Sequence, residues 1–162
     1  MMALIVEDGT GKVDSNTYVD AVDFNTWLSD RGLTLGGSLT DENLLLQATD
    51  YLETLSYIGI KNTQEQALLW PRSGAYIDGY LFPFDSIPKQ LIDAQMQVAY
   101  SIDQGVNPLA TIGQAVKKEK VDVIEVEYQD GTISKSTITA VNATLSKLLL
   151  SSGGSFNAYL SI

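Results

Sequence analysis

The chain has 162 residues, no cysteine, no histidine and a formal net charge of −10. The missing cysteines exclude disulfides and thiolate metal sites, and the missing histidines remove the commonest metal ligand and the usual titrating group near neutral pH. The acidic balance argues against a nucleic-acid binder, since such proteins normally carry a basic footprint. Length and composition predict one soluble globular domain without a signal peptide or a membrane span.

The first predicted elements are an extended arm and a helix. Apolar residues 3–6 precede the turn-rich residues 8–11, a pattern typical of a short strand or extended arm. This turn is not a phosphate-binding loop, because Val13 stands where that motif needs serine or threonine. A helix is predicted at residues 20–31, with Asp20 as its N-cap.

Two longer helices follow. Thr40 caps a helix predicted at residues 41–57, whose broad apolar face is that of the most buried helix. A short helical turn is predicted at residues 63–69. The next helix is predicted at residues 88–103, because Pro88 suits the first helical position.

The pattern changes to a period of two from residue 115 onward, which predicts a two-stranded ribbon. Its first strand includes a slip or bulge near residues 123–124. Asp130–Gly131 is the expected turn, and residues 132–137 form the return strand. Because a ribbon of two strands is marginally stable alone, we expect it to contact a neighbouring subunit or a partner. The candidate ribbon contacts are Val121, Val123, Val126 and Tyr128.

The chain is predicted to finish with a helix at residues 140–150, a linker at residues 151–155 and an apolar tail. Such a tail is typical of a docking peptide, and a frayed terminus is the alternative. The candidate docking residues are Phe156, Tyr159, Leu160 and Ile162. The predicted fold class is therefore mainly α: a compact bundle of about four helices with a projecting β-hairpin and an extended C-terminal tail. Residues 1–150 would form the domain, and residues 151–162 the linker and tail.

The most distinctive stretch lies at residues 66–83, where Trp70 directly precedes Pro71 and Arg72. A residue before proline is disfavoured in a helix, so the chain should turn or extend at Trp70. Two interpretations stay open: a core-anchoring loop that pins two helices, or a stiff recognition loop at a subunit boundary. The planar fork of Arg72 could bind carboxylates or exposed carbonyls in either case.

No set of converging catalytic groups is apparent. Asp20 with Asp23 and Glu125 with Glu127 are paired acids, but a helix start and the solvent face of a strand explain them. Nucleotide, EF-hand and zinc patterns are absent from the sequence. We therefore expect no enzymatic activity, no cofactor and no metal.

Several segments resemble, in order and spacing, a family of small tailed-phage head–tail adaptor proteins that are often labelled DnaT-like single-stranded-DNA-binding proteins. The segments are MALIVEDGTG at residues 2–11, NTYV at 16–19, ATDYL at 48–52, QALLWPRSG at 66–74, IP at 87–88 with DAQ at 93–95, and VKKEKV at 116–121. The resemblance runs from residue 2 to about residue 150.

The resemblance implies a structural virion protein at the head–tail junction, made in the host cytoplasm. It would form a homo-oligomeric, dodecameric ring that binds the portal protein and tail or neck proteins. Double-stranded DNA would pass through the ring without specific binding, and Trp70, Arg72 and the C-terminal tail would face the portal or a neighbouring subunit. Another virion or cytoplasmic interaction protein of similar fold is a further possibility.

The alternative function is that of a DnaT-like single-stranded-DNA-binding module. In that case Trp70, Tyr76, Tyr80 and Phe82 would stack on bases. Arg72 and the lysine cluster at residues 117–120 would contact phosphate.

Overall fold

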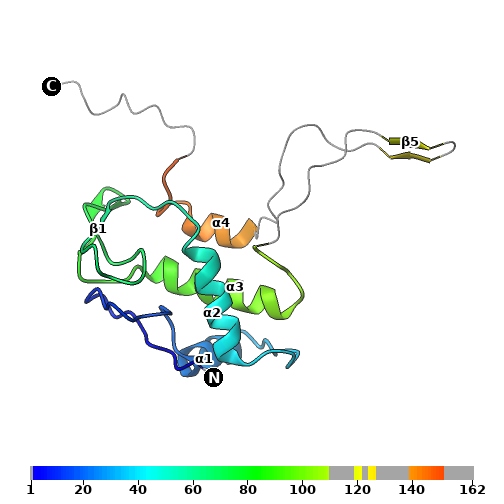
Figure 1. The fold of residues 1–162 in the computed structure, drawn as a ribbon, viewed down its shortest axis with the longest axis horizontal. Coiled ribbons are helices and arrows are strands. Elements are labelled where there is room, and N and C mark those ends of the chain that lie inside the picture. Colours follow the sequence, from blue (N-terminus) through cyan, green and yellow to red (C-terminus); the bar gives the residue numbers. More distant parts are fainter. Residues whose placement is uncertain (1, 110–118, 122–123, 127–138, 152–162) are drawn as a thin grey trace.

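The computed structural model describes residues 2–109, 119–121, 124–126 and 139–151 (Figure 1). The helices of this part are α1 (Ala21–Asp30), α2 (Asp41–Leu52), α3 (Lys89–Asp103) and α4 (Thr139–Leu145). The strands form antiparallel pairs: β1 (Ile60–Lys61) with β2 (Arg72–Ser73), β3 (Tyr76–Ile77) with β4 (Tyr80–Leu81), and β5 (Glu119–Val121) with β6 (Ile124–Val126). The predicted mainly helical fold of about four helices is confirmed, and the structure adds the small hairpins β1–β2 and β3–β4, which the sequence analysis did not predict.

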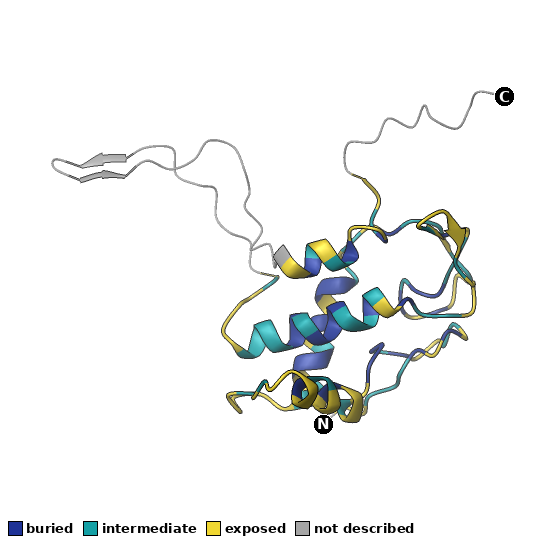
Figure 2. Ribbon diagram, turned by 180° about the vertical axis from the view of Figure 1, so that it is seen from behind, coloured by how far each residue is buried: buried dark blue, intermediate teal, exposed yellow. Residues whose placement is uncertain are grey.

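The core is built around α2 and α3. α2 packs against both α1 and α3, and α3 also packs against α4. Figure 2 shows a buried face on α2, whereas most of α1 is exposed. No helix of the described ranges is both long and apolar enough to cross a bilayer.

The predicted N-caps of α1 and α2 are confirmed, whereas Pro88 is the N-cap of α3 and not its first helical residue. Oδ1 of Asp20 accepts a 2.7 Å hydrogen bond from the backbone amide of Asp23 at the start of α1. The Thr40 hydroxyl accepts from the amide of Asn43 at the start of α2. Each of these two side chains satisfies a backbone donor that has no partner inside its helix.

Gln95 is a buried polar centre on the apolar face of α3. Its Oε1 accepts from the backbone amide of Tyr18 at 2.9 Å. Its Nε2 lies within hydrogen-bond distance of the Leu45 carbonyl (3.0 Å) and the Thr49 hydroxyl (2.9 Å) on α2. Nε2 also donates to the Thr17 hydroxyl at 2.7 Å. One side chain therefore joins the N-terminal arm to both central helices.

The second helix ends earlier than the apolar pattern predicts, at Leu52 instead of residue 57. The hydroxyl of Tyr57 turns back and donates to the carbonyl of Leu52 at 2.8 Å. The Thr54 hydroxyl donates to the carbonyl of Tyr51 at 2.6 Å. These side chains satisfy carbonyls at the helix end, so the buried aromatic at position 57 belongs to the following turn.

The prediction of a helical turn at residues 63–69 was wrong, because this segment contains bends and no helix. Thr63 and Gln66 bond each other reciprocally: the Thr63 amide donates to Oε1 of Gln66, and the Gln66 amide donates to the Thr63 hydroxyl. Side chains thus replace the backbone bonds that a helical turn would make.

The last helix is also shorter than predicted and ends at Leu145 instead of residue 150. Leu149 forms an antiparallel bridge with Tyr57, and the Leu148 carbonyl accepts from the amide of Ile58 at 2.9 Å. Pairing with the segment after α2 therefore competes with helix continuation for these backbone groups.

The C-terminal ribbon begins its return strand earlier than predicted. Val121 pairs with Ile124 and Glu119 with Val126, so both strands lie within residues 119–126. Two residues separate the strands, the length of a tight hairpin loop, so β5 and β6 are not joined by the expected turn at Asp130–Gly131. The pattern of residues 121–128 predicted one strand with a bulge, whereas in the structure Val121 and Val126 belong to two paired strands. The expected turn at Asp130–Gly131 and the expected return strand at residues 132–137 lie outside the described residues.

Candidate functional site around the Trp70 loop

Trp70 lies wholly inside the core, as a core-anchoring loop requires. Its ring meets Tyr57 edge to face at a centroid distance of 5.9 Å, and Phe82 in the same manner at 6.0 Å. The indole Nε1 has no hydrogen-bond partner within the part of the chain that the structure describes. The Trp70–Pro71 peptide bond is cis. A ring enclosed in this way cannot stack on a base at the surface.

Arg72 acts as an internal clamp. Its Nε donates to the carbonyl of Ile58 at 2.7 Å, and its Nη2 donates to that of Gly59 at 2.8 Å. Nη1 donates to the carbonyl of Leu69 at 3.1 Å. The guanidinium therefore fastens the segment after α2 to the Trp70 loop, and burial lowers its pKa below the usual value.

A tyrosine and a glutamate hold the other side of the loop. The Tyr18 hydroxyl donates to Oε1 of Glu53 at 2.6 Å and accepts from the amide of Trp70 at 3.2 Å. Oε2 of Glu53 accepts from the amide of Leu69 at 2.7 Å. Burial raises the pKa of Glu53 above its usual value, although the bonds from Tyr18 and Leu69 oppose this.

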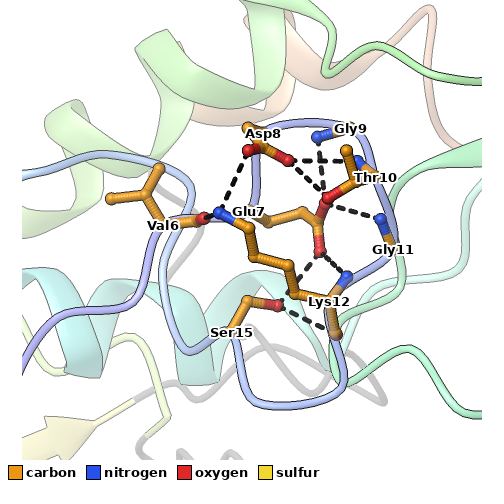
Figure 3. Close-up of polar contacts among 8 residues, drawn as sticks. All are labelled: Val6, Glu7, Asp8, Gly9, Thr10, Gly11, Lys12 and Ser15. Atoms are coloured by element: carbon orange, nitrogen blue, oxygen red, sulfur yellow. Dashed lines mark hydrogen bonds and ion pairs between the residues drawn. The ribbon is translucent and has the colours of Figure 1, made fainter.

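Glu7 occupies the glycine-rich loop near the N-terminus (Figure 3). Its Oε1 accepts from the amides of Gly9 and Gly11, both at 2.9 Å. Its Oε2 accepts from the amide of Lys12 at 2.7 Å and from the hydroxyl of Ser15 at 3.1 Å. The amides that could otherwise bind an external anion therefore bind this carboxylate, and the loop does not act as a phosphate-binding loop. Sequence reasoning missed Glu7, although an acid directly before such a turn is a usable signal.

The exposed aromatic surface lies on the β3–β4 hairpin, immediately after the Trp70 loop. Tyr76 pairs with Leu81, and Ile77 pairs with Tyr80. We call the exposed apolar side chains of this region the hairpin patch. Its members, with their exposed fractions, are Tyr76 (63%), Tyr80 (80%), Leu81 (61%) and Phe84 (63%).

The charges close to the hairpin patch are mainly acidic. Asp78 lies in the turn between β3 and β4, and Asp85 directly follows Phe84. Lys147, on the turn after α4, pairs with Asp78 at 2.8 Å. The patch therefore has an apolar face with acidic residues at its edge, which differs from the basic aromatic surface of a typical DNA binder.

The comparison with known families matches residues 2–161 to the family described as "Putative DnaT-like ssDNA binding protein". The chain belongs to this DnaT-like family. No curated protein and no solved structure matches it. The family match confirms the DnaT-like part of the resemblance noted in the sequence, and it extends through the C-terminal tail.

The four aromatic side chains that could stack on bases fall into two groups according to their exposure. Trp70 is enclosed and Phe82 is half-buried against the core. Tyr76 and Tyr80 are exposed. Sequence reasoning could not separate these groups, because all four residues lie in one aromatic-rich stretch.

Most of the other predicted contact residues of this DnaT-like protein lie outside the described residues: Val123, Tyr128, Phe156, Tyr159, Leu160, Ile162 and the lysines at 117 and 118. The backbones of Val121 and Val126 lie on β5 and β6. No cluster of three or more acidic side chains that could hold a metal ion occurs within the described ranges.

Proposed function

We propose that this member of the DnaT-like family is a structural head–tail adaptor of a tailed-phage virion. In this proposal, copies of the chain form a ring that binds the portal protein and extends the DNA channel towards the tail. The observation that carries the proposal is the internal use of Trp70 and Arg72. Trp70 and Arg72, which would otherwise suit nucleic-acid binding, make contacts inside the fold. The exposed surface that follows them is an apolar hairpin, which suits a protein partner.

The negative charge of the chain supports a role in which DNA passes the protein without binding to it. The chain has twenty acidic and ten basic residues, which gives a net charge of −10. A channel lined with acidic side chains would repel the phosphate backbone and let packaged DNA pass.

The proposed function includes no chemical reaction. The carboxylates of Glu7 and Glu53 both accept hydrogen bonds that hold loops in place. General acid or base chemistry requires a group that can reach a substrate, and these carboxylates face backbone amides and hydroxyls of their own chain.

Single-stranded-DNA binding is the second candidate, favoured by the family description and by the exposure of Tyr76 and Tyr80. Two tyrosine rings on a hairpin could stack on successive bases. We rank this function second because the net charge of −10 would repel phosphate, and because Lys147, the cation that reaches the hairpin turn, is paired there with Asp78.

The deciding experiment mixes the purified chain with the purified portal ring of the same phage. We expect a stable complex in sedimentation, with a ring of this protein below the portal in cryo-electron micrographs. In parallel, a labelled single-stranded oligonucleotide is titrated at low and at physiological salt. Tight binding that weakens steeply with salt and is lost in the Tyr76→Ser, Tyr80→Ser variant, together with no portal complex, would replace the adaptor proposal by the second candidate.

A further inference from the structure

The β3–β4 hairpin presents an apolar face to solvent. Ile77 packs against the core, whereas its cross-strand partner Tyr80 is 80% exposed, so only the Ile77 end of this pair is turned towards the body. The cross-strand pair Tyr76 and Leu81 lies on the opposite side, because successive residues of a strand point to opposite faces. Both side chains are more than half exposed, and Phe84 follows three residues later with similar exposure.

The C-terminal end of the described chain lies next to this hairpin. Lys147 reaches the hairpin turn through its 2.8 Å ion pair with Asp78. Two residues later, Leu149 bridges to Tyr57, and the amide of Leu150 donates to the carbonyl of Ser56 at 3.0 Å. The chain therefore leaves the body at residue 151 from a place that is fixed relative to the hairpin patch.

The sequence beyond residue 151 suits an apolar surface. Residues 148–162 contain no charged side chain. In an extended conformation, Phe156, Ala158, Leu160 and Ile162 would share one side. The linker at residues 151–155 spans at most about 17 Å, which keeps the apolar segment close to the hairpin.

We propose that residues 156–162 dock on the hairpin patch of their own chain. Phe156 and Leu160 would cover Tyr76 and Leu81, and the short linker would hold the segment at a millimolar effective concentration. A second copy or a partner would have to compete with this tethered segment. The contact shields an exposed apolar surface in the unassembled protein, and assembly would have to release it. It does not depend on the proposed function, since it is made within one chain.

A spin label on the full-length protein tests this contact. The chain has no cysteine, so Ser161→Cys provides a single attachment site. We expect the label to broaden the amide signals of residues 76–84 in the same molecule. Because the tether alone keeps the label nearby, the decisive comparison is with Leu81→Ser and with Phe156→Ser, Leu160→Ser, both of which should reduce the broadening. The control Val22→Ser removes an exposed apolar side chain of α1 and should leave the broadening unchanged.

Hydrogen exchange of the unlabelled full-length chain gives a second readout. We expect the amides of residues 76–84 to exchange about ten-fold faster in the Phe156→Ser, Leu160→Ser variant than in the wild type. Unchanged broadening and unchanged exchange in the variants would overturn the proposal. So would broadening that arises only when spin-labelled chains are mixed with isotope-labelled ones, because the segment would then dock on a second copy.

Discussion

Tyr18 and Glu53 lie 35 residues apart in the chain, and the Tyr18 hydroxyl donates a 2.6 Å hydrogen bond to Oε1 of Glu53. The same hydroxyl accepts from the amide of Trp70, and the other oxygen of Glu53 accepts from the amide of Leu69. This pair therefore satisfies two consecutive backbone donors of the Trp70 loop. The loop owes its position to side chains from the N-terminal arm and from the end of α2.

The Glu53 carboxyl should make stability depend on pH. Burial raises its pKa in the folded state above the value of 4.5 for an unperturbed glutamate, so the folded protein binds this proton more readily than the unfolded chain. Its contribution is fully present below pH 4.5 and is lost as the pH rises through the raised pKa. Urea unfolding between pH 4 and pH 7 should show this loss, at most about 1.4 kcal/mol per pH unit, in the wild type.

The Glu53→Gln variant provides the control, because glutamine does not titrate. The difference in unfolding free energy between wild type and variant should shift in favour of the variant as the pH rises. A difference that stays constant over this range would contradict the assigned effect of burial.

Glu7→Gln should destabilise the protein by about 3 kcal/mol, because an amide would turn donor hydrogens towards groups that themselves donate. In the wild type, each carboxylate oxygen accepts from backbone amides of the loop at residues 9–12. Thermal and urea unfolding measure the loss. The matched control is Glu65→Gln, which removes the charge of an exposed glutamate and should change the unfolding free energy by less than about 0.5 kcal/mol.

Gly9→Ala should be among the most damaging alanine substitutions in the N-terminal arm. Gly9 has a φ of +104°, and a Cβ at this position would lie 2.1 Å from the backbone carbonyl oxygen of Asp85. The loop and the segment before α3 would have to separate, at a loss of about 3 kcal/mol or more. Gly37→Ala is the control, since Gly37 also has a positive φ but its Cβ would meet nothing within 4 Å. Its loss should be about 1 kcal/mol. Equal losses in urea unfolding would mean that the close approach to Asp85 is unimportant.

Arg72→Lys should weaken the Trp70 loop although it keeps the charge. A lysine ammonium cannot reproduce the fork that donates to the carbonyls of Ile58, Gly59 and Leu69. We expect a loss of about 2 kcal/mol in unfolding free energy, together with faster hydrogen exchange at residues 57–59. If Arg72 instead serves only an external partner, the isolated protein should keep its stability and lose only binding.

The sequence determined much of the helical architecture, because its signals are local. The Asp20 and Thr40 caps and the 3.6-residue apolar period depend on neighbours within one or two turns, and they placed α1 and α3 to within a residue or two. The family membership likewise followed from short ordered segments such as residues 66–74.

Only the tertiary structure decided where helices stop and which aromatics are available to a partner. α2 ends at Leu52 and α4 at Leu145 because the segments that follow them pair with each other through Tyr57 and Leu149, 92 residues apart (149 − 57). Trp70 is enclosed and Tyr80 is exposed although they share one aromatic-rich stretch, because the former packs against Tyr57 and Phe82. Such contacts join residues that are distant in sequence, and no local pattern encodes them.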